Sequence, residues 1–294
     1  MSGKDKMKLS IITINYNNAI GLKKTLDSVA CQTCTDFEHI IVDGASTDES
    51  VEIIREYEKT LSFNLSSLTS HLTWLSEPDT GIYNAMNKGV RLAKGEYTLM
   101  LNSGDYLVDE NVVENVLPLL NGTDIIQGNT IEEIHDNRYR NRGYGKSDID
   151  FFDVMKGYFL HQASFCRRDL FNRYGMFDES YRIIGDTKFF MTCLGVNNAS
   201  FKYADVDIAN YDINGISAQT SGAWADTRAV EYLRMREELY SKRLNSFFEE
   251  NDKKVRLYNK LHQNKWIWYL VMAITHMHDM IYPSNSNIKK ESIK

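Results

Sequence analysis

The stretch from Ser76 to Asp105 reads SEPDTGIYNAMNKGVRLAKGEYTLMLNSGD, and its order of loop, helix, strand and loop decides the fold. An acidic turn at 77–81 precedes a helical pattern, and Gly95 follows that pattern as a residue suited to a helix C-cap. A nearly continuous apolar strand at 97–101 then leads into the polar loop Asn102–Asp105. Polar groups at successive strand ends predict a ligand crevice along one edge of a sheet.

The chain before this stretch repeats the same alternation. Apolar runs predict strands at 9–14, 37–42 and 72–75, and amphipathic patterns predict helices at 20–30 and from Asp48 onward, Asp48 serving as an N-cap. Strands that alternate with helices over the first hundred residues predict βαβ units and a mainly parallel sheet.

Beyond residue 105 the alternation becomes irregular. A loop is expected there at 135–150, which is charged, contains glycines and is expected to be mobile at the surface. In the first half, the Ser-, Thr- and Asn-rich segment 60–71 is also expected to be a loop. Patterns in the second half predict further elements: helices at 109–120, 169–174, 186–194, 225–249 and 252–281, strands at 124–127 and 161–167, and a turn at 214–217.

Composition places the chain among ordinary globular proteins. It has 294 residues, of which 43% are hydrophobic and 25% charged, and this length can bury a sizeable core. The net charge of −6 argues against nucleic acid as the principal partner. The N-terminus lacks a signal-peptide pattern and no segment reaches the ~20 apolar residues of a membrane span, so a cytoplasmic location is expected.

The pair Cys31 and Cys34 has the spacing of a redox motif. A redox dithiol needs a helix N-terminus to lower the pKa of its first thiol, whereas this pair follows the helical pattern at 20–30 and therefore lies at a C-terminal end. A structural role is the better interpretation. Cys166 and Cys193 have no partner at metal-ligand spacing, so a zinc site is not expected.

Acidic and amide side chains end four successive strands of the first half. Asp and Asn commonly end strands because they favour turns, and for one loop that explanation would suffice. Four consecutive cases instead favour a binding site. Because the chain lacks both the G-x-G-x-x-G and the G-x-x-x-x-G-K-[ST] loops, carboxylates would have to recognise a nucleotide, and Mg²⁺ or Mn²⁺ would have to neutralise its phosphates.

Three segments of the chain, Leu9–Asn17, His39–Ser50 and Glu77–Asp105, resemble the family 2 glycosyltransferases with the GT-A fold. The resemblance covers about residues 8–220, and it is most similar to the bacterial capsule and exopolysaccharide branch, which includes colanic-acid-type enzymes. It implies an α/β, Rossmann-like domain with a mainly parallel central sheet flanked by helices.

The resemblance also implies a division of the chain. A GT-A domain at 8–224 would consist of a nucleotide-sugar-binding half, 8–105, and an acceptor-binding half, 106–224. Residues 225–294 would form a C-terminal helical extension.

The resemblance implies a role for the polar strand ends. Tyr16 and its neighbours would pack on the nucleotide base, Asp43 would hydrogen-bond the base, typically uracil, and Asp79 would lie near the nucleoside or the donor sugar. The residues expected to bind the nucleotide sugar are Tyr16, Asn17, Asp43, Asp48, Asp79, Asn102 and Ser103.

The loop Asn102–Asp105 occupies the position of the family's metal-binding D-x-D motif but departs from it. Asn102 and Gly104 replace two of the usual carboxylates, so Asp105 is the expected ligand for Mg²⁺ or Mn²⁺. Mg²⁺ commonly rests on one or two carboxylates together with substrate phosphates. The departure leaves both strong and weak metal dependence open.

Asp186 matches the family position that deprotonates the acceptor hydroxyl. An N-cap role for Asp186 is the alternative, and the two roles are compatible. His161 and Gln162 match a His-Gln pair of this branch and are expected to contact donor or acceptor; burial as core residues is the alternative. The absence of the Q-x-x-R-W motif of processive synthases indicates one sugar per acceptor.

The expected function is transfer of one sugar, with inversion, from a nucleotide sugar, typically a UDP-sugar, to a saccharide or lipid-linked acceptor of a bacterial surface polysaccharide. Two alternatives remain at this point: a sugar-nucleotide nucleotidyltransferase, which should carry a Gly-rich basic first loop, and a catalytically decayed nucleotide- or carbohydrate-binding protein, with which Gly104 is compatible.

The segment 252–281 combines basic residues with a Trp- and Tyr-rich apolar run. This composition predicts peripheral contact with the inner face of an anionic membrane. Packing on the protein core or across a homo-oligomer interface is the alternative.

Overall fold

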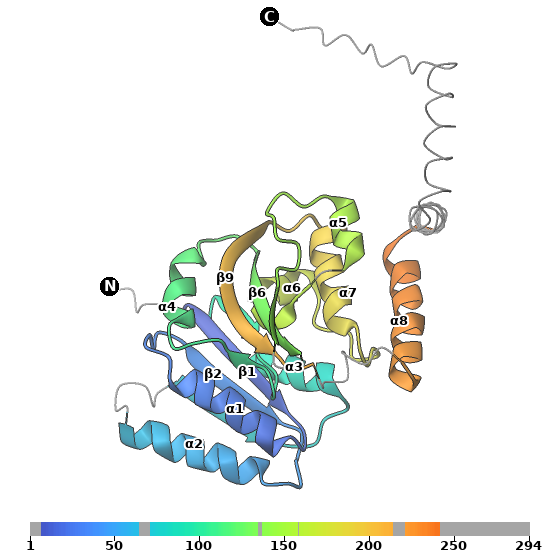
Figure 1. Ribbon diagram of the computed structural model, residues 1–294. Helices are drawn as coiled ribbons and strands as arrows, with labels where there is room; N and C mark the ends of the chain where they lie inside the picture. Colours follow the sequence, from blue (N-terminus) through green and yellow to red (C-terminus); the bar gives the residue numbers. More distant parts are fainter. Residues whose placement is uncertain (1–6, 65–70, 135–136, 158, 214–220, 242–294) are drawn as a thin grey trace, which may run out of the picture. The chain divides into compact units, whose positions relative to one another are not determined.

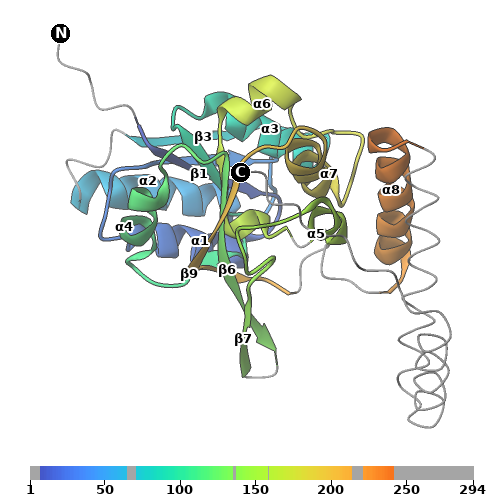
Figure 2. The same ribbon diagram turned by 90° about the horizontal axis from the view of Figure 1, so that it is seen from above.

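The computed structural model describes residues 7–64, 71–134, 137–157, 159–213 and 221–241 (Figure 1). The chain divides into two compact units, 1–235 and 236–294, and the described sheet lies within the first. Within that unit, helices pack on both faces of a twisted central sheet (Figures 1 and 2).

The sheet contains nine strands in the described part of the chain, in the order β3-β2-β1-β4-β8-β6-β9-β5, with β7 paired to β6. Their bounds are β1 Leu9–Asn15, β2 Glu38–Asp43, β3 Leu72–Ser76, β4 Tyr97–Met100, β5 Tyr106–Leu107, β6 Ile125–Ile134, β7 Asn137–Asn141, β8 Ser164–Arg167 and β9 Phe201–Tyr211. The block β3-β2-β1-β4 is parallel, which confirms the predicted βαβ half. Strand β8 joins antiparallel to β4 and β6, so the second half is mixed.

Helices of varied length connect these strands. Their bounds are α1 Ala19–Ala30, α2 Ser50–Asn64, α3 Ile82–Leu92, α4 Val112–Val116, α5 Phe151–Lys156, α6 Asp169–Tyr174, α7 Gly185–Met191 and α8 Ala223–Leu239. Short 3-10 turns occur at Leu117–Leu119 and at His161–Ala163, here called η2 and η3, and a π-helical turn, η4, extends α7 over Thr192–Val196.

The parallel block is covered on both faces (Figure 2). On one face, α1 and α2 pack on Ile41 through a cluster that includes Leu22, Leu26 and Ile54. On the other face, α3 lies directly against β1, because Gly89 has no side chain and a Cβ there would stand 2.4 Å from the Ile12 side chain. Burial on both faces explains why β1 and β2 read as continuous apolar runs.

The register of the parallel strands brings their polar ends level. Asn15 of β1 is paired with Asp43 of β2, and Asp43 is paired with Ser76 of β3. The loop after β4 reaches the same edge, since the backbone N–H of Ser103 donates to the carbonyl of Ile14 at 3.0 Å. The predicted crevice edge is therefore formed by residues from four separate strand ends.

The end of β9 also reaches this edge. Strand β5 pairs antiparallel with β9, Tyr106 opposite Asn210, so the chain leaving β9 passes beside the loop after β4. Gly128 permits the bulged pairing of β6 with β9, because a Cβ there would stand 2.4 Å from Ile208. This arrangement brings Asp212 next to Asp105.

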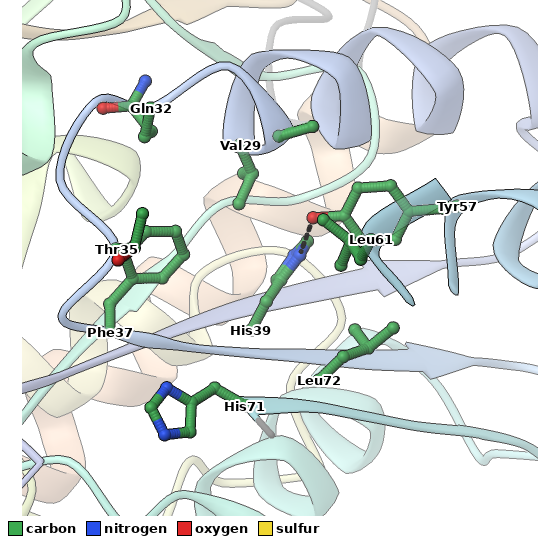
Figure 3. A pocket seen from close by; sticks show the side chains of 10 residues that line it. Val29, Gln32, Thr35, Phe37, His39, Tyr57, Leu61, His71 and Leu72 are labelled. Carbon is green, nitrogen blue, oxygen red and sulfur yellow. Dashed lines mark hydrogen bonds between the residues drawn. The ribbon is translucent and has the colours of Figure 1, made fainter. Parts of the chain in front are cut away.

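A cavity of about 30 Å³ lies between α1, α2 and the amino-terminal ends of β2 and β3, away from the polar edge (Figure 3). His39 and Tyr57 line it, and the Tyr57 hydroxyl lies 2.9 Å from Nδ1 of His39. The other ring nitrogen lies 3.0 Å from the hydroxyl of Thr13. The His39 side chain is thus buried between two hydroxyl groups inside the core.

Two predicted loops are partly wrong. Residues 60–64 continue helix α2, because Leu61 adds to the apolar stripe formed by Ile54 and Tyr57 and packs in the same cluster. Within 135–150, strand β7 pairs with β6, and its arginines form cross-strand or neighbouring ion pairs, such as Arg140 with Asp207. A polar sequence can form an edge strand when its charges have partners on adjacent strands.

Two local predictions near the site are also corrected. Helix α3 ends with Ala93 as the extended C-cap, and Gly95 does not have positive φ. Gly95 is instead needed for a close approach, since a Cβ there would stand 2.6 Å from the backbone nitrogen of Ser10. The segment predicted as a strand from residue 161 begins as the 3-10 turn η3, and β8 starts only at Ser164.

Helices α1 and α8 agree with the sequence-based predictions, and two other predicted segments lie outside the described residues. Cys31 is the C-cap of α1, as predicted, and burial raises its thiol pKa, which disfavours the reactive thiolate. Helix α8 confirms the first part of the helix predicted at 225–249. The predicted turn at 214–217 and helix at 252–281 lie outside the described residues. Among the described helices, none is both long enough and apolar enough to span a bilayer.

Candidate active site

The first two loops of the polar edge are tied together by hydrogen bonds. Asn17 has a positive φ of 50° and its side-chain oxygen accepts from the backbone N–H of Thr47 at 2.8 Å. Asp48 accepts from the backbone N–H groups of Ala19 at 2.9 Å and Ser50 at 3.1 Å, and these bonds lower its pKa although burial raises it. Asn17 and Asp48, both expected near the nucleotide, therefore shape the loops that face it.

Asp43 lies at the centre of this edge and is fully buried. One carboxylate oxygen accepts from the Asn15 amide at 2.8 Å and from the Ser46 hydroxyl at 2.5 Å. The other accepts from the Ser46 backbone N–H at 2.9 Å and from the Ser76 hydroxyl at 2.7 Å. Asp43 thus joins β1, β2 and β3, and its oxygens already have donors within the protein.

Tyr16, Gly44 and Asp79 form a more open surface beside Asp43. The Tyr16 ring is 66% exposed, and a Cβ at Gly44 would stand 3.1 Å from that ring and 2.5 Å from Oδ2 of Asp79. The other oxygen of Asp79 accepts from the backbone N–H of Gly81 at 2.9 Å. Because Gly44 has no side chain, a half-buried carboxylate and an exposed aromatic ring lie next to each other.

Hydrogen bonds from α1 and from the residue before it hold the loop after β4. The Thr25 hydroxyl donates to the carbonyl of Asp105 at 2.7 Å and accepts from the backbone N–H of Gly104 at 3.0 Å. The Asn18 side chain donates to the carbonyl of Ser103 at 3.1 Å. This loop therefore has a fixed backbone, and Ser103 lies where the first and fourth loops meet.

Asp105 is 5% exposed and has a carboxylate neighbour that the sequence did not indicate. Its Oδ1 accepts from the backbone N–H of Asp212 at 2.9 Å. Gly104 has a φ of 106°, and a Cβ there would stand 2.8 Å from a carboxylate oxygen of Asp212, so glycine is required for this approach. Burial raises the Asp105 pKa to about 6, with a smaller upward contribution from the Asp212 charge.

The donor set of this loop suits a hard divalent cation with few protein ligands. No group of three or more His, Cys, Asp or Glu in the described residues has the arrangement of a metal site. Asp105 and Asp212 nevertheless bring two carboxylates together, and the side-chain oxygen of Asn102 is buried without a hydrogen-bond partner among the described residues. Mg²⁺ accepts such a partial set when phosphate oxygens and water complete its octahedron.

Asp186 lies in the first turn of α7 and is held by two side chains. The Tyr83 hydroxyl donates to Oδ1 at 3.0 Å, and His161 Nδ1 lies 2.9 Å from Oδ2. Burial raises the Asp186 pKa, but the hydrogen bond and charge of His161 outweigh it, and the net shift is downward. The carboxylate is therefore ionised at neutral pH, as a general base must be.

His161 connects Asp186 to the loop after β4. Its Nε2 lies 3.3 Å from the Asn102 amide, so one imidazole spans the two acidic parts of the edge. Burial lowers the His161 pKa, but the bond to Asp186 and the charges of Asp186 and Asp105 raise it overall. Gln162 is 4% exposed in η3, a burial typical of a core residue.

Sequence reasoning missed Tyr83 and Asp212 at this site. Tyr83 is the second residue of α3 and is part of its amphipathic pattern, which explains why it was not singled out. A polar aromatic residue at a helix start near a strand end was nevertheless a usable signal. Asp212 follows β9, whose pairing with β5 cannot be deduced from local sequence. Both contacts join residues more than 100 positions apart.

The sheet order and the carboxylates at its edge are those of a transferase with the GT-A fold. The model of the family described as glycosyl transferase family 2 matches residues 10–179, and the chain belongs to that family. It is a glycosyltransferase, and the nucleotidyltransferase alternative is set aside.

Two relatives illustrate the similarity in sequence. The chain is 34% identical over 212 residues to the PGL/p-HBAD biosynthesis glycosyltransferase of Mycobacterium tuberculosis, a match that covers 71% of this chain and 78% of the relative. It is 31% identical over 108 residues to the poly(ribitol-phosphate) beta-N-acetylglucosaminyltransferase TarS of Staphylococcus aureus, which covers 36% of this chain and 18% of TarS.

Solved structures show the same fold. S. aureus TarS in complex with UDP-GlcNAc aligns with a TM-score of 0.57 at 21% identity, over 70% of this chain and 58% of that chain. The mannosyltransferase PcManGT from Pyrobaculum calidifontis, in complex with GDP-Man and Mn²⁺, aligns with a TM-score of 0.54 at 17% identity, over 96% and 89% of the two chains. At these identities the likeness extends to the GT-A fold alone.

Proposed function

We propose that this protein is an inverting, non-processive glycosyltransferase that moves one sugar from a UDP-sugar to a hydroxyl group of a saccharide or lipid-linked acceptor in bacterial surface polysaccharide synthesis, in the capsule and exopolysaccharide branch. The observation that carries the proposal is the ionised Asp186, which is held by His161 and Tyr83 and linked through His161 to the loop after β4. A fixed base beside a polar phosphate-facing loop is the arrangement that single displacement requires.

On the donor side, residues 8–105 would bind the nucleotide. The Tyr16 ring and the Asp79 carboxylate would contact the base, with Asp43 supporting them from beneath through its bonds to three strands. Asn17, Asp48, Asn102 and Ser103 would set the shape of the surrounding loops. Structures of the same fold contain UDP, UDP-GlcNAc or GDP-Man, which supports a nucleotide sugar as donor.

On the acceptor side, residues 106–224 would present the hydroxyl group to Asp186. The carboxylate accepts the hydroxyl proton while the acceptor oxygen forms a bond to the anomeric carbon, and the bond from that carbon to the diphosphate oxygen breaks. UDP leaves with the electron pair of the broken bond. Because one displacement suffices, no covalent nucleophile is needed, and the anomeric configuration inverts.

A Mg²⁺ or Mn²⁺ ion would be held by Asp105 and Asp212. When bound, such an ion neutralises negative charge on the diphosphate leaving group. Its few protein ligands predict weak binding in the absence of donor. The segment 252–281 would place the enzyme at the inner face of the plasma membrane, near lipid-linked acceptors.

Donor hydrolysis and sugar transfer with a panel of UDP-, GDP- and dTDP-sugars, with and without Mn²⁺, test this proposal. Asp186→Asn should lower transfer by at least about 100-fold, because a general base typically contributes 10²–10⁴-fold. The same variant should keep donor binding, whereas Asp105→Asn should weaken the response to Mn²⁺. Wild-type activity equal to that of Asp186→Asn would favour a catalytically inactive binding protein.

A further inference from the structure

Helix α8 contains a buried carboxylate that contacts the segment just before the proposed base. Glu231 is 6% exposed, and its Oε1 accepts from the backbone N–H of Arg182 at 2.6 Å. Its Oε2 accepts from the N–H groups of Ile183 at 3.0 Å and Ile184 at 3.2 Å. Three consecutive backbone donors therefore converge on one side chain from a helix more than 40 residues away.

These donors would otherwise lack acceptors, because they precede α7. Backbone N–H groups at and just before a helix start have no intrahelical acceptor, and leaving them buried without a partner is unfavourable. Glu231 satisfies them and adds a negative charge near the N-terminus of α7, where the helix dipole favours it. Since Asp186 is only two residues beyond Ile184, the position of its carboxylate depends on this support.

Tyr83 makes a second contact with the same segment. A Cβ at Gly185 would stand 2.8 Å from the Tyr83 ring, so this ring packs directly on the backbone of residue 185. The Tyr83 hydroxyl then reaches Asp186. The segment that carries Asp186 is thus contacted by both Glu231 and Tyr83.

Two further side chains of α8 contact the segments that precede Asp186 and His161. Arg234 donates to the Ser180 hydroxyl at 2.6 Å and lies 3.7 Å from the centre of the Tyr181 ring. The Tyr232 hydroxyl donates to the carbonyl of Met155 in α5, in the chain that leads to His161. Helix α8 therefore contacts the segments before Asp186 and before His161.

We infer that Glu231 is a positioning residue of the transfer reaction: by fixing the backbone of residues 182–184 it holds Asp186 against the acceptor hydroxyl. The inference rests on the proposed role of Asp186 as base. It adds α8 to the catalytic unit, although the sequence indicated a boundary at residue 224.

The test compares Glu231→Gln and Glu231→Ala with Val230→Ala, a matched control on the same helix whose side chain is 66% exposed. Glutamine keeps the size of the side chain but replaces one accepting oxygen by an NH₂ group. Hydrogen exchange of the amides of 182–184 should accelerate in both Glu231 variants and stay unchanged in Val230→Ala. This readout does not depend on enzymatic activity.

In transfer assays, kcat of Glu231→Gln should fall about 10- to 100-fold, because a misplaced catalytic group can cost about 100-fold. The KM and the affinity for the donor should change less than twofold, since the hydrogen bonds described for Glu231 go to residues 182–184, outside the proposed donor-binding residues 8–105. The acidic limb of the kcat–pH profile should keep its position, because His161 rather than Glu231 sets the Asp186 pKa.

Unchanged amide exchange, or a kcat loss no larger than the loss of folded protein, would overturn the inference. A wild-type enzyme without transfer activity would instead contradict the proposed function, and amide exchange would still report on Glu231. If Asp186→Asn abolishes transfer while Glu231→Gln matches Val230→Ala, the proposed function stands and the positioning role is wrong.

Discussion

Asp105 and Asp186 are both carboxylates of the candidate site, but their surroundings move their pKa values in opposite directions. Burial raises the pKa of Asp105 to about 6, whereas the direct bond and charge of His161 keep that of Asp186 below its ordinary value despite burial. Pairs of acids whose environments separate their pKa values commonly mark distinct roles. Of the two, Asp186 keeps its negative charge to lower pH than Asp105 does.

Replacement of His161 should test most directly whether this residue lowers the Asp186 pKa. In His161→Gln the Asp186 carboxylate loses a cationic neighbour, so its pKa should rise and the acidic limb of the kcat–pH profile should move to higher pH. A shift of one pH unit would lower activity about tenfold on that limb. Because the wild-type Asp186 pKa lies below 3.8, transfer rates measured from about pH 3 to pH 8 provide the test.

Tyr83→Phe is the matched control for this measurement. The Tyr83 hydrogen bond lowers the Asp186 pKa less than the bond and the charge of His161 do, so the limb should move less than in His161→Gln. An acidic limb that stays in place in His161→Gln would show that His161 does not set the ionisation of the base.

At the scale of elements, the contact between α3 and β1 depends on Gly89. A Cβ at this position would stand 2.4 Å from the Ile12 side chain, which is fully buried. Gly89→Ala should therefore lower the free energy of unfolding by about 1–3 kcal/mol, the usual cost of overpacking a core. Urea denaturation measures the change.

A second substitution distinguishes packing from a backbone effect. Ile12→Ala alone leaves a cavity and should also destabilise the protein, but combined with Gly89→Ala it frees the space that the added methyl group needs. The double variant should be more stable than the sum of the two single changes predicts. Strict additivity would indicate that the Gly89 contact has little energetic weight.

The elements that could be predicted from sequence are those with a strong local pattern. Strands β1 and β2 are apolar runs buried on both faces, and α3 has a clear amphipathic period, so their positions follow from nearby residues alone. Strand β7 has no such pattern. Its pairing depends on partners such as Asp207, far along the chain, and a polar loop was the reasonable local interpretation.

At the scale of the whole molecule, the buried His39 couples stability to pH. Burial lowers the pKa of this imidazole to about 3, whereas the unfolded chain would have an ordinary value of about 6.5. Between these values the unfolded state binds a proton that the folded state does not bind. The free energy of unfolding should therefore fall as the pH decreases below 6.5, by at most about 1.4 kcal/mol per pH unit.

His39→Gln should remove this part of the pH dependence, although it should also lower stability at pH 8 by disturbing the bonds to Thr13 and Tyr57. Thr13→Val is the matched control, because it removes one hydrogen bond but leaves the titrating ring. Urea midpoints between pH 4 and 8 should show a flatter profile only for the His39 variant. Parallel profiles would assign the acid sensitivity to other groups.

The site could be predicted from sequence only in part, and the reason lies in the topology. Strand-end residues such as Asp43, Asp79 and Asp105 can be predicted from sequence, because parallel register brings their loops to one edge. Tyr83, Asp212 and Glu231 reach the same region through contacts between distant segments. Contacts between distant segments cannot be predicted from local sequence patterns, so these supporting side chains are identified only in the structure.

The hydrogen bonds that join the loops after β1 and β2 have a consequence for ligand binding. Asn17 bonded to Thr47, and Asp48 bonded to Ala19, keep these loops ordered before any donor arrives. The conformational entropy of ordering is then lost during folding rather than on binding, so the site is preorganised. We expect Asn17→Ala or Asp48→Ala to weaken donor affinity mainly through a less favourable binding entropy, which calorimetry would record even though neither side chain need touch the nucleotide.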